Sequence, residues 1–99
     1  MTQETTNSEE HSIFIGSKPF MNYVTGVVMQ FNNKGAEEVT IKSRGKFISK
    51  AVDVAEVSRR KFLAELNLKV KDIKIESEEF ENKEGKDVYV STMEIILAK

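Results

Sequence analysis

Apolar positions in the first part of the chain recur first as a short run and then at helical spacing. The run Ser12–Ile15 ends at Gly16 and predicts a short buried strand. Pro19 suits the first position of a helix, which is expected to stop near Asn32 with Gly35 as a left-handed cap. The core stripe of this helix is expected to be Phe20, Val24, Val27, Val28 and Phe31.

The middle of the chain repeats this strand-then-helix order. Alternation of apolar and polar residues predicts a strand over Glu38–Ser43, and a longer apolar pattern predicts a helix from about Phe47 to Leu66. Glu56 and Arg60 form a favourable i,i+4 pair on its polar side. The buried stripe of this second helix is expected to be Ile48, Ala51, Val52, Ala55, Phe62 and Leu63.

Two long strands close the chain, joined by a hairpin turn at Asn82–Gly85. The alternation of the first strand changes phase at Lys71–Asp72, which indicates a β-bulge. About twelve residues at about 3.3 Å each span roughly 40 Å. A domain of 99 residues has a radius of gyration of only about 13 Å. The hairpin is therefore expected to project from the body as an arm, over about residues 76–89.

The predicted fold class is α/β, more narrowly an α+β two-layer sandwich of order βαβαββ. A mixed four-stranded sheet would carry both helices on one face. Residues 12–99 are interpreted as a single domain. Residues 1–11 are polar and acidic without an apolar pattern, which is typical of a flexible tail.

Composition and charge narrow the function classes. The net charge of −1 argues against a uniformly basic protein that coats DNA. No cysteine is present, which excludes disulfides, thiolate metal sites and a cysteine nucleophile. The N-terminus is polar and no apolar run has membrane-spanning length, so a soluble intracellular protein is expected. Without a nucleophile-and-base set, a metal spacing or a nucleotide loop, we expect no catalytic residue, metal, cofactor or small-molecule substrate.

A basic stretch lies between the second strand and the second helix. It contains Lys42, Arg44, Lys46 and Lys50, and Gly45 lies at the turn. Alternate strand residues share a face, so Lys42 and Arg44 should point the same way. Fixed cations beside a helix N-terminus suit a phosphate backbone, although a solvated basic turn is the alternative.

Three segments of the chain, residues 15–24, 41–53 and 90–95, stand in the order and spacing of a known set of signatures. They resemble those of the Alba family of archaeal chromatin and RNA-binding proteins, and the resemblance extends over residues 12–99. It implies a fold like the C-terminal domain of translation initiation factor three. It also implies a non-enzymatic homodimer on the chromosome in the cytoplasm, whose body faces a DNA duplex and whose arms reach along the minor groove.

The resemblance also implies site residues. By position, Lys18, Asn22, Arg44 and Lys46 would lie on the nucleic-acid face, to which the basic stretch adds Lys42, and Phe62 would lie at a dimer–dimer contact. Two positions depart from the family pattern. Ser17, which is also counted among the candidate nucleic-acid-binding residues, replaces a lysine that is acetylated in the family. Lys46 replaces an arginine, which loses a bidentate phosphate contact.

The arm also departs from basic members of the family. Its acids are Glu76, Glu78, Glu79, Glu81, Glu84 and Asp87. These six acids against Lys83 and Lys86 give a local charge of −4. A phosphate groove should repel such an arm, so we expect binding weaker or more selective than that of basic members.

Three hypotheses follow. The first is a homodimer that binds double-stranded DNA mainly through phosphates, as a nucleoid-associated protein with possible higher assembly. The second is an RNA-binding protein, whose preference would be set by duplex geometry or exposed bases. The third is a protein-interaction module whose acidic arms dock basic partners.

Overall fold

The computed structural model of the protein describes residues 11–99. The strands are β1 (Ser12–Phe14), β2 (Glu38–Arg44), β3 (Lys69–Glu81) and β4 (Asp87–Ala98). The helices are α2 (Phe20–Asn32) and α3 (Ile48–Val57). Three short helical turns flank α3, namely η1 (Gly45–Phe47), η2 (Ser58–Phe62) and η3 (Ala64–Leu66). Apart from His11, the expected tail lies outside the described residues.

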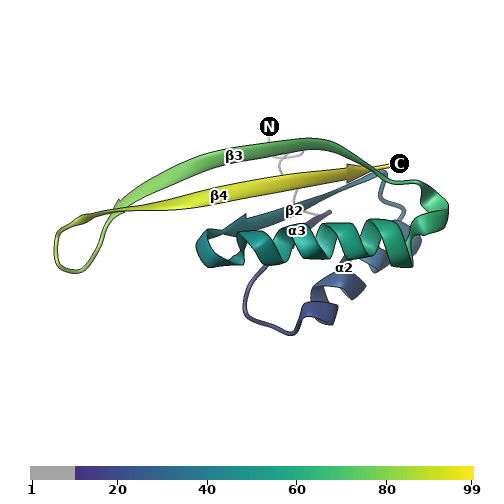
Figure 1. Ribbon diagram of the computed structural model, residues 1–99, viewed down its shortest axis with the longest axis horizontal. Coiled ribbons are helices and arrows are strands. Elements are labelled where there is room, and N and C mark those ends of the chain that lie inside the picture. The colour runs from purple at the N-terminus through teal and green to yellow at the C-terminus, as the bar shows by residue number, and fades with distance from the viewer. Residues whose placement is uncertain (1–10) are drawn as a thin grey trace.

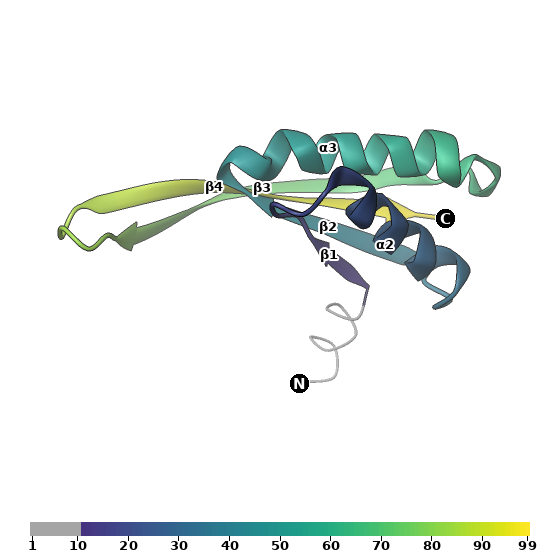
Figure 2. The ribbon, with the colours of Figure 1, turned by 90° about the horizontal axis from the view of Figure 1, so that it is seen from below.

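The four strands form one mixed sheet in the order β1-β2-β4-β3. β1 runs parallel to β2, and the other two pairs are antiparallel. Both helices pack against the same face of the sheet, as predicted (Figure 2). Helix α2 contacts β1 and β2, whereas α3 lies along β2 and β4. We call the opposite face, which neither helix covers, the open face.

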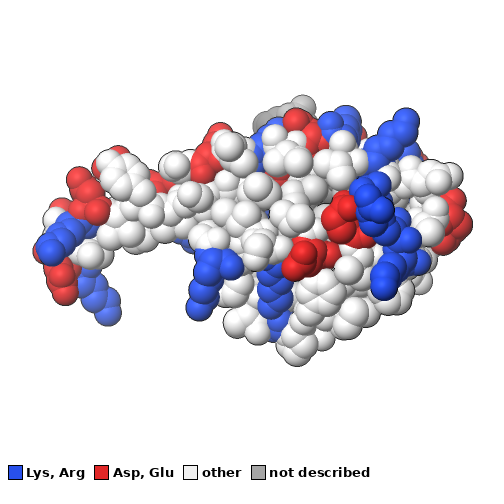
Figure 3. All heavy atoms as spheres, in the orientation of Figure 1, with Lys and Arg blue, Asp and Glu red and all other residues white. Residues whose placement is uncertain are grey.

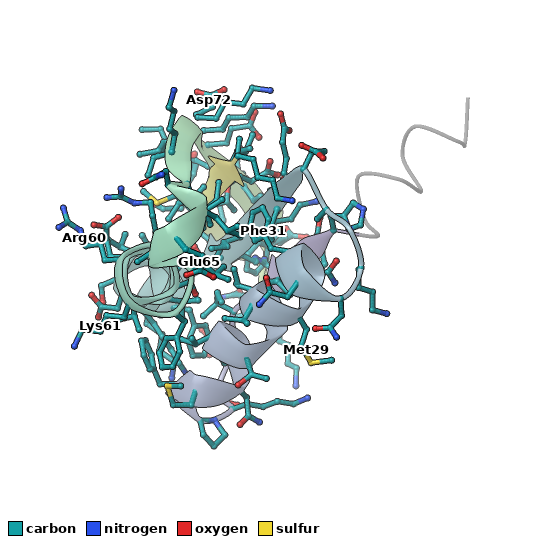
Figure 4. The ribbon with its side chains drawn as sticks, turned by 90° about the vertical axis from the view of Figure 1, so that its right-hand side faces the viewer. Met29, Phe31, Arg60, Lys61, Glu65 and Asp72 are labelled. Atoms are coloured by element: carbon teal, nitrogen blue, oxygen red, sulfur yellow. The ribbon has the colours of Figure 1, made fainter. Side chains whose placement is uncertain are left out.

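The core lies between the helices and the sheet. Val24, Val27 and Phe31 of α2 are buried as predicted, and they meet Val39 and Ile41 of β2. Figure 4 shows Phe31 pointing inward from α2, while Met29 points away from the body. Gly35 has the predicted left-handed conformation, with a φ of +69°, but the C-cap of α2 is Asn33, two residues earlier.

The second helix differs from the prediction. Instead of one helix to Leu66, α3 ends at Val57 and continues as the π-helical turn η2. A π-turn holds an extra residue, so side chains beyond it no longer follow the α-helical stripe. Phe62, expected to be buried, is 48% exposed, although Leu63 is fully buried. The prediction for Val52 was also wrong, because this residue is 40% exposed and Val54 takes its place in the core.

The N-terminal strand is less buried than predicted. Phe14 is 64% exposed, because alternation along β1 turns it to the open face while Ile15 enters the core. Pro19 precedes α2 as its N-cap rather than occupying the first helical position. His11 is not detached from the body, since its carbonyl accepts a hydrogen bond from the amide of Thr40.

The arm is formed by β3 and β4. The ladder shows the predicted bulge between Val70 and Asp72, and the turn at Asn82–Gly85 joins the strands. The hairpin extends past the helices and gives the molecule dimensions of 49 × 33 × 21 Å (Figure 1). Within residues 11–99, no helix combines the length and apolar character needed to cross a membrane.

Candidate nucleic-acid interface

Strand β2 presents two cations on the open face. Val39, Ile41 and Ser43 point into the core, so the alternating positions Lys42 and Arg44 point the other way together. The Arg44 side chain is 60% exposed. Lys42 Nζ lies 5.2 Å from the centre of the Phe14 ring, which is a cation–π distance. A guanidinium and an ammonium therefore lie two residues apart beside an exposed aromatic ring.

Phe14 connects this pair to the start of α2. One shallow hollow is lined by Phe14, Lys18 and Asn22, and a second is lined by Phe14, Lys42 and Arg44. Lys18 and Asn22 are both exposed. The fold thus gathers four of the predicted residues around one aromatic side chain. Ser17 is exposed in the same loop as Lys18, directly before it.

Lys46 lies around the turn from the other cations of the basic stretch. Gly45 has a φ of +52°, a conformation that suits glycine, and this bend starts the η1 turn. Lys46 is exposed and its Nζ lies 5.5 Å from the centre of the Phe47 ring. Neither η1 nor α3 has a side-chain cap at its N-terminus. The first amides of η1 can donate hydrogen bonds to an anion without displacing a capping side chain, whereas the amide of Ile48 already binds the carbonyl of Gly45.

Lys50 has a role that the sequence did not reveal. Its Nζ donates hydrogen bonds to the carbonyls of Gly16 and Lys18, each at 2.7 Å. The Tyr23 hydroxyl accepts hydrogen bonds from the amides of the same two residues, each at 3.0 Å. Lys50 Nζ also lies 5.0 Å from the centre of the Tyr23 ring. The loop that carries Ser17 and Lys18 is thereby fixed to the start of α3, and the charge of Lys50 is directed inward.

Acidic side chains share the open face with these cations. Arg44 Nη2 forms a 2.9 Å ion pair with Glu78 Oε1 of the arm. Glu76 and Glu94 line the same hollow as Lys42 and Arg44. On the side of the molecule that carries α3, Figure 3 likewise shows basic and acidic side chains interspersed. The positive potential is therefore local, in keeping with the net charge of −1.

The basic residues after α3 form a separate group. Arg59 and Arg60 both bind the carboxylate of Glu56, with closest distances of 3.0 and 2.8 Å. The hydrogen bond from Arg60, with a smaller contribution from Arg59, lowers the pKa of Glu56 below its ordinary value. Arg60 and Lys61 point outward from the end of the helical segment (Figure 4). The charges of Arg59 and Arg60 are already partly neutralised.

The side chains on this surface are suited to binding a ligand through charge and aromatic contacts. Among residues 11–99, no three histidine, cysteine, aspartate or glutamate side chains are grouped so that they could hold a metal ion. His11, the only histidine of the chain, places its Nδ1 2.8 Å from Gln30 Oε1. The open face offers two neighbouring cations and an exposed ring, and the loop beside that ring carries a third cation.

Comparison with known proteins gives a consistent result. A family model described as Alba matches residues 11–77. The chain is 54% identical over 90 residues to DNA/RNA-binding protein Alba 1 of Archaeoglobus fulgidus, which covers 91% of this chain and 97% of that protein. It is 52% identical over 92 residues to DNA/RNA-binding protein Alba of Methanothrix thermoacetophila, which covers 93% and 99%.

A solved structure agrees with these sequence relatives. Alba from Thermoplasma volcanium superimposes with a TM-score of 0.80 at 48% sequence identity. The match covers 89% of this chain and 99% of that chain.

Proposed function

The chain belongs to the Alba family, and from this premise we propose that it is a non-enzymatic protein that binds nucleic acid, principally double-stranded DNA. The observation that carries the proposal is the placement of Lys42 and Arg44 side by side on the open face, with Lys18 and Asn22 beyond Phe14. Cations and amide donors of this kind contact phosphates and sugars, which position a protein on a duplex without reading its sequence. The protein would act on the chromosome inside the cell.

We further propose that the binding unit is a homodimer. On the helix side of the arm, Ile73, Ile75 and Tyr89 are 53%, 71% and 68% exposed. A groove beside them is lined by Ile48, Ile75 and Met93. Apolar side chains that are gathered at one place and that residues 11–99 of their own subunit leave exposed suit a second copy of the chain. Phe62, also exposed, is available for a contact between dimers on DNA.

Dimerisation would double the phosphate contacts. Two copies of Lys18, Lys42, Arg44 and Lys46 would give about eight phosphate contacts. For that number, a plot of the logarithm of the binding constant against the logarithm of salt concentration should have a slope of about −7. The decisive experiment is a salt titration of binding to a DNA duplex. Arg44→Ala should weaken binding at every salt concentration and reduce the slope by about one per subunit.

The matched control for this experiment is Lys34→Ala. It removes the same charge from an exposed residue just beyond the C-terminal end of α2. The control should bind almost as the unmodified protein does. If binding is insensitive to salt, or if both variants bind equally, the phosphate-binding proposal is rejected.

RNA is the second candidate ligand, and Phe14 is the observation in its favour. The ring is 64% exposed between the hollow that contains Lys18 and the hollow that contains Arg44. A ring in that place can stack on a base that is not paired in a duplex, and such stacking contributes about 1–3 kcal/mol per base. Duplex DNA keeps its bases stacked and offers the ring little.

The two ligands are distinguished by competition between a single-stranded RNA and a DNA duplex of equal length. Phe14→Ala should lower affinity for the RNA by about fivefold or more and leave the duplex nearly unaffected. Phe14→Leu keeps an apolar side chain without the ring and should behave like the alanine variant. Equal losses for both nucleic acids, or no loss for RNA, would remove Phe14 as a reason to favour RNA.

A further inference from the structure

The ion pair between Arg44 and Glu78 joins two strands that are not neighbours. β4 lies between β2 and β3, so the Arg44 side chain extends across the sheet to reach the arm. The register places Arg44 opposite Thr92 and Glu78 opposite Val90, which is the next position on that face of β4. The guanidinium is thus held along the open face, 2.9 Å from a carboxylate oxygen.

The bulge in β3 determines which acids of the arm reach the open face. The ladder resumes with Asp72 opposite Ile96, so every second residue from there shares the side of Arg44. Glu76 and Glu78 therefore line the hollow of Lys42 and Arg44. Glu79 pairs with Tyr89 and lies on the other side of the hairpin.

We propose that Glu78 is an internal competitor for Arg44, which occupies the place of a nucleic-acid phosphate and so sets the affinity and selectivity of the open face. This inference rests on the proposed function. A carboxylate and a phosphate offer a guanidinium the same kind of paired oxygen acceptors. A phosphate that binds Arg44 must displace Glu78, and the released carboxylate then lies close to the incoming negative charge.

The competition is graded rather than absolute. The two side chains are 60% and 55% exposed, and exposed ion pairs are weak because water and salt screen them. A polyanion that makes several contacts at once can displace Glu78. A ligand with only a few phosphates gains less from its other contacts. Glu78 therefore favours long or densely charged nucleic acid over short anionic ligands.

The test compares Glu78→Gln with Glu79→Gln in duplex-binding assays at fixed low salt. Each variant removes one negative charge from adjacent residues of the arm, but only Glu78 contacts Arg44. Glu78→Gln should bind more tightly than Glu79→Gln by about two- to fivefold per subunit. The advantage should be larger for a short duplex than for a long one, and it should vanish in the Arg44→Ala background.

Each other outcome has a definite meaning. Equal gains from the two glutamine variants, or a gain from Glu78→Gln that persists without Arg44, would overturn this inference and leave only the general charge of the arm. If the unmodified protein and Arg44→Ala bind duplex equally, the proposed function itself fails. Circular dichroism of each variant shows that the comparison is made between folded proteins.

Discussion

At the scale of single residues, a lysine in a basic stretch of the sequence does not necessarily add its charge to the surface that the stretch forms. Lys50 belongs to the basic stretch of the sequence, yet its ammonium binds the carbonyls of Gly16 and Lys18 and lies over the ring of Tyr23. These contacts tie the loop before α2 to α3. Lys50 thus fixes the loop that carries Lys18, and we propose that it positions this loop and does not itself bind phosphate.

Lys50→Met should therefore weaken duplex binding without changing the number of phosphate contacts, which is measured by the salt slope. The apolar chain keeps much of the packing but removes both hydrogen bonds, so the loop loses its fixed geometry. We expect about a several-fold loss of affinity, from hydrogen bonds of a charged donor, at an unchanged salt slope. Hydrogen exchange at the amides of Gly16 and Lys18 should become faster.

The salt slope also gives the result that would contradict this assignment. If Lys50→Met lowers the slope by about one per subunit, as expected for Arg44→Ala, Lys50 contacts phosphate directly. Lys34→Ala serves again as the control that removes a charge without affecting the loop.

Local pattern predicted some residues of the candidate interface and missed others. The shared face of Lys42 and Arg44 follows from strand alternation alone, and the structure has it. The exposure of Phe14 did not follow, because three apolar residues in a row do not show which of them faces outward. The contact of Arg44 with Glu78 depends on register across an intervening strand, which no local pattern contains.

At the scale of elements, the segment after β2 is the clearest case of tertiary structure overriding periodicity. The apolar spacing predicted one helix, but the chain forms η1, α3, a π-turn and a final 3₁₀ turn. Near the end of α3, Glu56 holds Arg59 and Arg60 together across the junction with the π-turn. We expect this group to stabilise the C-terminal end of α3.

The pKa of Glu56 gives this group a pH dependence. Because its folded-state pKa lies below the ordinary value, the carboxylate stabilises the fold at neutral pH and loses that effect as pH falls through the folded pKa. Glu56→Gln should lower the melting temperature at pH 7. The difference from the unmodified protein should diminish in acid, once the pH falls below the ordinary carboxyl value of 4.5 and through the lowered pKa of Glu56. The side chain is 36% exposed, so we expect a loss of less than about 1 kcal/mol.

Glu65→Gln is the control for this prediction, because it removes a charge from the exposed η3 turn of the same segment. Thermal unfolding of both variants between pH 3 and pH 7 makes the comparison. A deficit of Glu56→Gln that stays constant over this range would show that the ion pairs are not its cause.

At the scale of the whole molecule, a thin arm extends from a compact two-layer body, and its helix side is apolar near the body. The length of the hairpin, its turn and its bulge were predictable from strand spacing and from the change of phase. The exposure of Ile73 and Ile75 could not be predicted in this way, because the exposure of an apolar strand residue depends on how far the helices of the same subunit extend.

Ile75→Asp tests the proposed homodimer. A charge at a residue that is 71% exposed should leave the monomer fold intact but prevent burial against a second copy. We expect light scattering to give the mass of a monomer. Duplex affinity should fall by at least about tenfold, because half of the phosphate contacts are lost.

Met29→Asp is the matched control for the dimer experiment. It adds the same charge at an apolar residue that is 46% exposed and points away from the body on α2 (Figure 4). This variant should keep the mass of the unmodified protein. A dimer that survives Ile75→Asp would place the contact between subunits elsewhere.

The bulge has a consequence for how the arm tolerates changes in chain length. Lys71 is the residue that the ladder skips, so its deletion leaves Val70 opposite Leu97 and Asp72 opposite Ile96. A deletion at any of residues 72–77 would instead shift Glu78 by one place in the ladder and turn it to the helix side. Among residues 71–78, Lys71 is therefore the one whose deletion leaves the later residues of β3 on their present faces, with the loss of its ion pair to Glu38.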